Sequence, residues 1–153
     1  MVGAQTYAVV FAWRPNGVVV NTRSLDRDAW PKNWMDFAKP KPEWRIAVGE
    51  ASSLGSAYSV VVGLYHFLGE ERTAALFKGI QSVQFKIFTG GTQGAKWVAT
   101  AEANIGIGVQ LDRYLRLARA GAPVAWLDLD PTGPGGQLAA DGDCEERPPS
   151  KRR

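Results

Sequence analysis

The chain has 153 residues, of which 45% are hydrophobic and 22% charged, a composition typical of one globular domain. Its single cysteine excludes a disulfide framework, and the absence of any apolar run of about 18 residues argues against a membrane span. The net charge of +3 permits a phosphate-bearing partner without requiring one. The N-terminus lacks the features of a secretory signal, so an intracellular protein, cytoplasmic or nuclear, is expected.

The N-terminal part of the chain predicts three strands. Two runs rich in β-branched and aromatic residues, 6–13 and 18–22, flank Asn16 and Gly17, and Asn-Gly between such runs favours a hairpin turn. Residues 23–45 follow neither a helical nor a strand period, which predicts a long exposed connection. Residues 43–49 alternate enough to form a third strand.

Helical spacing of apolar residues appears next, over 53–68. The expected buried face consists of Leu54, Tyr58, Val61, Tyr65 and Leu68, widened by Ala57 and Leu64. A short second helical segment over 70–78 is expected to follow. Residues 82–89 alternate as a strand does, and the glycines of 90–94 interrupt that pattern.

Residues 96–101 are compatible with either a short strand or a helix. Residues 107–118 predict a helix that Gly121 closes, and 123–129 predict a last strand. The resulting order predicts an α/β fold: a mixed five-stranded sheet with flanking helices. Residues 5–130 are expected to form this single domain, and 131–153, rich in proline, glycine and charge, a disordered tail.

Three segments resemble the ribonuclease H family. Residues 53–68 are similar to its first helix, 83–91 (VQFKIFTGG) to its fourth strand, and 116–141 to its closing helix, strand, loop and aspartate. The resemblance spans 5 to 141 and implies a ribonuclease H-like fold.

This chain departs from that family at the carboxylates that would hold two divalent metals. The matching positions carry Phe11, Ala12 and Trp13 in the first strand, Ala57 or Tyr58 in the helix, Gly90 after the fourth strand and Pro131 in the loop. Only Asp141 remains. The resemblance therefore implies a domain with no catalytic residues, no metal and no other cofactor.

Tryptophan is the most unusual component of the sequence. Four of the six, Trp13, Trp30, Trp34 and Trp44, lie among basic residues in the first part of the chain. Indole rings beside cations can stack nucleic-acid bases, but they can also be core residues or attach a long loop to the body. The candidate nucleic-acid-binding residues are Arg23, Arg27, Trp30, Lys32, Trp34, Lys39, Lys41, Arg113, Arg116 and Arg119.

Other candidate sites are weaker. The glycine-rich segment 90–94 follows a predicted strand, but its spacing matches no phosphate-binding motif, so a plain turn is favoured over an anion site. Acidic residues near strand ends, Glu50, Asp128 and Asp130, could form a carboxylate pair, although such acids are usually solvated. His66 and Cys144 have no partners at ligand or catalytic spacing.

These observations predict a non-catalytic nucleic-acid-binding domain whose partner is RNA or an RNA/DNA hybrid and whose affinity falls with salt. The alternative is a protein-interaction or assembly module, in which the Trp-rich surface contacts a protein partner or a second copy. An enzymatic function would require Asp128, Asp130 and Asp141 to converge around a metal. No membrane partner is expected.

Overall fold

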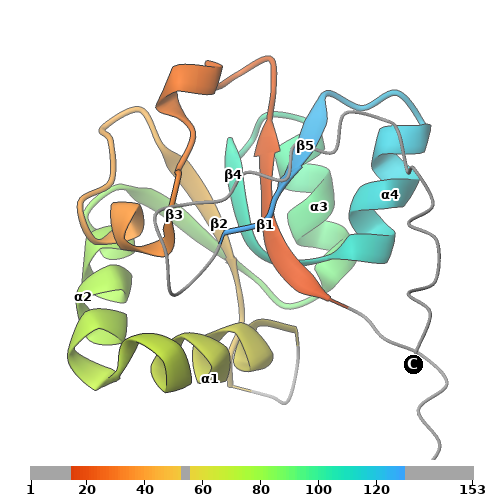
Figure 1. Ribbon diagram of the computed structural model, residues 1–153. Coiled ribbons are helices and arrows are strands. Elements are labelled where there is room, and N and C mark those ends of the chain that lie inside the picture. Colours follow the sequence, from red (N-terminus) through yellow and green to blue (C-terminus); the bar gives the residue numbers. More distant parts are fainter. Residues whose placement is uncertain (1–14, 53–55, 130–153) are drawn as a thin grey trace, which may run out of the picture.

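A computed structural model describes residues 15–52 and 56–129 (Figure 1). Its regular elements in chain order are β1 (Asn16–Asn21), η1 (Arg27–Ala29), η2 (Trp34–Ala38), β2 (Arg45–Gly49), α1 (Ser56–Leu68), α2 (Glu70–Gln81), β3 (Gln84–Phe88), α3 (Gly91–Ala99), β4 (Ile105–Gln110), α4 (Leu111–Arg119) and β5 (Val124–Leu127). The expected strand 6–13 and tail 131–153 lie outside the described residues, so the division into a domain over 5–130 and a tail stays a prediction.

The described strands form one mixed sheet in the order β3-β2-β4-β1-β5. β2 is parallel to both β3 and β4, whereas β1 is antiparallel to β4 and β5. Helices connect the parallel strands, as crossover connections require. The predicted α/β class, a mixed five-stranded sheet with flanking helices, is confirmed.

Side chains that alternate along the strands give the sheet two apolar faces. Val18 and Val20 of β1 belong to a core shared with α1, α2 and the β1–β2 connection. Val19, between them, points to the opposite face and packs with residues of α3 and α4. Figure 1 shows α3 and α4 next to each other beside the strands, away from α2. The sheet is therefore the middle layer of the fold.

A β-bulge redirects the end of β4. The register pairs Val18 with Ile107 but Gly17 with Val109, which leaves Gly108 as the extra residue, with φ at +81°. Ile107 faces α1 and α2, whereas Val109, two residues later, faces α3 and α4. The bulge thus reverses the side-chain alternation just before the strand ends and α4 begins.

The predicted helix over 107–118 is wrong in its first part. Residues 105–110 form β4, and α4 begins only at Leu111. β4 is a central strand with apolar contacts on both faces, so its sequence lacks the polar alternation that marks a half-buried strand.

Residues 91–99 form the helix α3. This decides between the strand and the helix that were both compatible with 96–101, and it shows that 90–94 is not a plain turn.

α1 forms, but it buries only part of the predicted face. Ala57 and Leu64 are buried, whereas Tyr58 and Tyr65 are 44% and 55% exposed. Leu54 lies outside the described residues. Because α1 carries apolar side chains on more than one face, helical spacing alone includes exposed tyrosines in the predicted buried stripe.

The predicted exposed connection between β1 and β2 is instead largely packed on the core. Leu25, Trp34, Phe37 and Trp44 are buried there. Asn104, also buried, holds the end of the connection: its Oδ1 accepts from the Arg45 amide and its Nδ2 donates to the Glu43 carbonyl, both at 2.8 Å. Buried polar groups satisfied in this way allow an irregular segment to lie against the core.

The bulge predicts the effect of one substitution. Gly108→Ala would place an L side chain in left-handed backbone, with its Cβ 3.3 Å from Ala57 Cα. We expect the free energy of unfolding in urea to fall by about 1–2 kcal/mol. Gly63→Ala is the matched control, because nothing lies within 4 Å of the added Cβ in α1. It should raise stability by about 0.5–1 kcal/mol. Equal effects of the two substitutions would contradict the role assigned to Gly108.

Candidate functional site

The carboxyl ends of β2, β3 and β4 meet at one edge of the sheet, because these strands are parallel. β1 starts at the same edge, where Asn16 is paired with Gln110 at the end of β4. This edge is at the bottom of Figure 1, where β2 leads toward α1. The chain leaves β2 toward one face of the sheet and leaves β4 toward the other. Ligands of open α/β sheets bind outside the carboxyl ends of strands at such a switch point.

Two helices begin at this edge. Gly90 is the N-cap of α3 and Gln110 is the N-cap of α4. Neither helix start has a side-chain capping hydrogen bond. The Leu111 amide donates to the Pro15 carbonyl at 3.0 Å, so a backbone group already occupies the start of α4. First-turn amides have no partner inside a helix and carry partial positive charge. The start of α3 is therefore the better anion-binding position of the two.

Polar side chains surround the start of α3. A Cβ on Gly91 would lie 3.3 Å from Gln110 Oε1, so the Gln110 amide adjoins the first turn of α3. Thr92 is exposed in that turn. On the β2 side, the Ser52 hydroxyl donates to a Glu50 carboxylate oxygen at 2.5 Å. The edge thus combines hydroxyl, amide and carboxylate groups with the open start of a helix.

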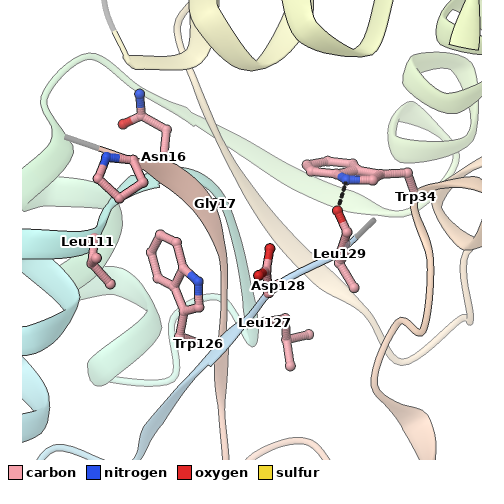
Figure 2. A pocket seen from close by; sticks show the side chains of 9 residues that line it. Asn16, Gly17, Trp34, Leu111, Trp126, Leu127, Asp128 and Leu129 are labelled. Atoms are coloured by element: carbon pink, nitrogen blue, oxygen red, sulfur yellow. Dashed lines mark hydrogen bonds between the residues drawn. The ribbon is translucent and has the colours of Figure 1, made fainter. Parts of the chain in front are cut away.

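A pocket of about 320 Å³ opens at the same edge, between β1 and β5 (Figure 2). β5 pairs with β1 only from Val124 to Leu127, while β1 extends beyond that ladder to Asn16, so the strands separate there. Asn16, Leu111, Trp126 and Asp128 are among the lining residues. The pocket consequently lies next to the start of α4 and to the Asn16–Gln110 pair.

A second hollow, of about 280 Å³, lies between α2 and the β2–β3 side of the sheet. Phe77, Ile80, Phe85 and Ile87 make its wall apolar, and Glu50 and Ser52 line it as well. The two hollows thus lie near opposite edge strands of the sheet, one by β5 and the other by β3.

The structure places the predicted nucleic-acid-binding residues on two separate surfaces. Arg23, Arg27, Trp30, Lys32, Trp34, Lys39 and Lys41 lie in the β1–β2 connection, and Arg113, Arg116 and Arg119 lie on α4. The connection packs on the α1–α2 face of the sheet and α4 on the opposite face. Trp34 is only 8% exposed, and its indole N–H donates to the Leu129 carbonyl at 2.8 Å. Trp30 likewise donates to the Leu25 carbonyl.

The candidate acids do not form a metal centre within the described residues, where no group of three His, Cys, Asp or Glu side chains gathers. Glu50 follows β2 and Asp128 follows β5, and β4 and β1 lie between these two strands in the sheet. His66 is exposed on α1. Asp130, Asp141 and Cys144 lie outside the part of the chain that the structure describes.

Sequence reasoning did not select Asn16, Ser52 or Gln110 as site residues, and it favoured a plain turn over an anion site for the segment that contains Thr92. One signal was available, because the glycines of 90–94 follow a strand, where α/β folds place ligand-binding loops. Without the strand order, however, nothing in the sequence joins that segment to Gln110 or to Asn16.

The model of the family "bacterial extracellular solute-binding protein" matches residues 3–128. The chain belongs to this family. The ribonuclease H-like identification is therefore wrong, and so are the nucleic-acid-binding function, the RNA or RNA/DNA hybrid partner and the alternative protein-interaction module. The expected intracellular location is wrong as well, since the family is extracellular. A search among curated proteins gives no match. In the described part of the chain, no helix is long and apolar enough to cross a membrane.

Solved periplasmic binding proteins and their relatives share the fold. AfuA from Actinobacillus pleuropneumoniae, solved with exogenous fructose-6-phosphate bound, is 26% identical with a TM-score of 0.63 over 81% of this chain and 39% of AfuA. Iron-bound HitA from Pseudomonas aeruginosa is 19% identical (TM-score 0.62; 77% of this chain, 39% of HitA). Apo FutA2 from Synechocystis PCC6803 is 18% identical (TM-score 0.62; 82% and 42%). The chain thus spans about two fifths of their length.

Trp34 provides a test of the packing described above. Trp34→Phe keeps an aromatic ring but leaves the Leu129 carbonyl without its indole donor. We expect the free energy of unfolding to fall by about 1–3 kcal/mol, because a buried acceptor loses its partner. Trp97→Phe is the control, since Trp97 is only partly buried and contacts Lys86 through its ring rather than through a hydrogen bond. A Trp34→Phe protein as stable as the control would show that the indole hydrogen bond contributes nothing.

Proposed function

We propose that this chain supplies one lobe of an extracellular solute-binding protein, and that its sheet edge forms one wall of a cleft for a small anionic organic solute. The observation that carries the proposal is the meeting of three parallel strand ends with the uncapped start of α3 at one edge. Helix starts of this kind bind phosphate and carboxylate groups through backbone amides.

The family and the length of the chain support this proposal. Residues 3–128 match the solute-binding family, while the chain covers only 39% of AfuA. The opposite wall of the cleft would therefore come from a part of the protein that these residues do not supply. AfuA, at 26% identity, was solved with fructose-6-phosphate, a sugar that carries an anionic group.

The residues at the edge have the chemistry that such a solute needs. Gly91 has no side chain, so an anionic oxygen can approach the first-turn amides of α3 closely. The exposed Thr92 hydroxyl supplies a further donor in that turn, whereas the Gln110 atom nearest to Gly91 is Oε1, an acceptor. Glu50 can accept hydrogen bonds from sugar hydroxyls at the end of β2. The wall thus offers donors for the anion and an acceptor for hydroxyl groups.

A charge at the start of α3 tests the proposal. Gln93→Glu adds one negative charge in the first turn of α3 with almost no change in shape. We expect fructose-6-phosphate to shift the amide resonances of Gly91 and Thr92 in the unaltered chain, and to bind Gln93→Glu about 3–10-fold more weakly through charge repulsion. The stability of the variant should be unchanged or higher, because acidic residues favour a helix start. Amide NMR titration and urea unfolding measure the two effects.

Gln84→Glu is the matched control, because it places the same charge at the start of β3, at the opposite end of the parallel strands. Its affinity for fructose-6-phosphate should equal that of the unaltered chain. Absence of any shift at Gly91 and Thr92 at millimolar ligand, or equal weakening by both variants, would contradict an anion site at α3.

A further inference from the structure

The apolar hollow between α2 and the β2–β3 side of the sheet opens at the edge where α3 begins. We propose that this hollow receives an uncharged aryl or alkyl group of the solute, so that the protein binds amphipathic anions rather than fully hydroxylated ones. The inference rests on the proposed function, because it adds a second point of contact for the solute that the start of α3 would bind.

Apolar side chains from three elements form the wall of the hollow. Phe77 and Ile80 come from α2, Val48 from β2, and Phe85 and Ile87 from β3. Phe85 and Ile87 are 39% and 59% exposed, and among the described strands the exposed large hydrophobic side chains are these two. A ligand that covers them removes apolar surface from water and therefore gains affinity.

Glu50 and Ser52 give the hollow a polar rim. Both residues follow β2, and the Ser52 hydroxyl donates to a Glu50 carboxylate oxygen at 2.5 Å. A carboxylate at the rim repels an anionic group, so the charged end of a solute stays outside while its uncharged end enters. Ligand pockets commonly combine an apolar wall with a few polar groups that fix the orientation of the ligand. The rim thus directs the anion of the solute away from the hollow.

Backbone contacts hold the hollow close to the start of α3. The Glu50 amide donates to the Phe88 carbonyl at 2.8 Å, which keeps the rim beside the last residue of β3. Gly90, the N-cap of α3, lies two residues beyond Phe88, an interval of at most about 7 Å. The hollow is on the α2 face of the sheet and α3 on the opposite face, so the solute would cross the end of β3. An anionic group joined to a ring by a short linker can reach both positions.

The size of the hollow favours a ring over a segment of protein. Its volume of about 280 Å³ exceeds that of an apolar cavity that binds benzene, about 150 Å³. An α-helix is about 10 Å wide with its side chains, so a partner helix could insert no more than a side chain. A small solute is therefore the occupant that fills the hollow best.

The chemistry of the wall discriminates between classes of solute. Sugar hydroxyl groups placed against Phe85 and Ile87 would lose their water and find no hydrogen-bond partner on those side chains, which costs free energy. A phenyl or alkyl group has no such cost and gains from burial. A sugar phosphate can thus use the start of α3 and the rim but not the wall, whereas an aryl phosphate can use the start of α3 and the wall.

Two phosphates that differ in one group test the inference. Benzyl phosphate carries a phenyl ring where methyl phosphate carries a hydrogen atom, and the phosphate is the same. We expect NMR titration to show that benzyl phosphate binds about tenfold more tightly and shifts the Ile87 δ1 methyl resonance, because the ring leaves water.

Ile87→Gln makes the wall polar at an exposed position, and the loss of its methyl signal assigns that resonance. This variant should reduce the preference for benzyl phosphate to about twofold. Val62→Gln is the matched control, since Val62 is 47% exposed on α1 and does not line the hollow. It should retain the tenfold preference.

The possible results separate the two proposals. Equal affinity for both phosphates, with shifts at Gly91 and Thr92, would overturn the apolar site and leave the anion site standing. A preference that Ile87→Gln leaves unchanged, or that Val62→Gln reduces equally, would also overturn the apolar site. Benzyl alcohol, which has the ring without the charge, is the third probe. If it shifts the Ile87 resonance while methyl phosphate shifts neither amide, the hollow is supported and the anion site at α3 fails.

Two further results would contradict the inference. If none of the three probes shifts any resonance at millimolar concentration, both proposals are wrong. If sedimentation shows a dimer that Ile87→Gln dissociates, a second copy of the chain covers the hollow, and a solute does not.

Discussion

The position of β4 between one parallel and one antiparallel neighbour is the constraint on which the rest of the structure depends. Its parallel pairing with β2 directs helices to both faces of the sheet and brings the strand ends together. Its antiparallel pairing with β1 places Asn16 beside Gln110, although the two are far apart in the chain. The bulge at Gly108 then turns Val109 toward α3 and α4, whereas Ile105 and Ile107 before it lie on the face covered by α1 and α2. Gln110, which adjoins the start of α3, lies at the strand end where this pairing brings β1 and β4 together.

The tryptophans and cations of the β1–β2 connection show how a packing function resembles a binding function in sequence. Trp30, Trp34 and Trp44 donate to backbone carbonyls, and Arg27 lies over the Trp30 ring at 5.6 Å. The backbone of this irregular segment has no neighbouring strand to pair with, so side-chain hydrogen bonds of this kind hold it against the core instead. Indole rings near cations are equally what a nucleic-acid surface needs, so composition could not separate the two uses.

The sequence was informative where the signal is local. Strands at 43–49, 82–89 and 123–129 and the helix over 70–78 were predicted near their observed positions, because alternation or helical spacing marks them. β4 was mistaken for helix because a strand buried on both faces has no alternation. The site required knowledge of which strands are neighbours, which depends on contacts between distant residues. Mixed α/β sheets of different families share similar element orders, and loose resemblance to one of them misled the assignment.

The edge strand β3 bears on how the folded chain avoids aggregation. Only one side of β3 is paired, and Phe85 and Ile87 are exposed on it, so its open backbone groups could template the addition of another strand. Lys86 lies between these two residues at the centre of the strand. Two copies that paired in antiparallel fashion about this centre would bring like charges opposite each other. A charge at the centre of an edge strand disfavours such pairing, and Lys86, whose Nζ also lies 3.5 Å from a Glu102 carboxylate oxygen, occupies that position in β3.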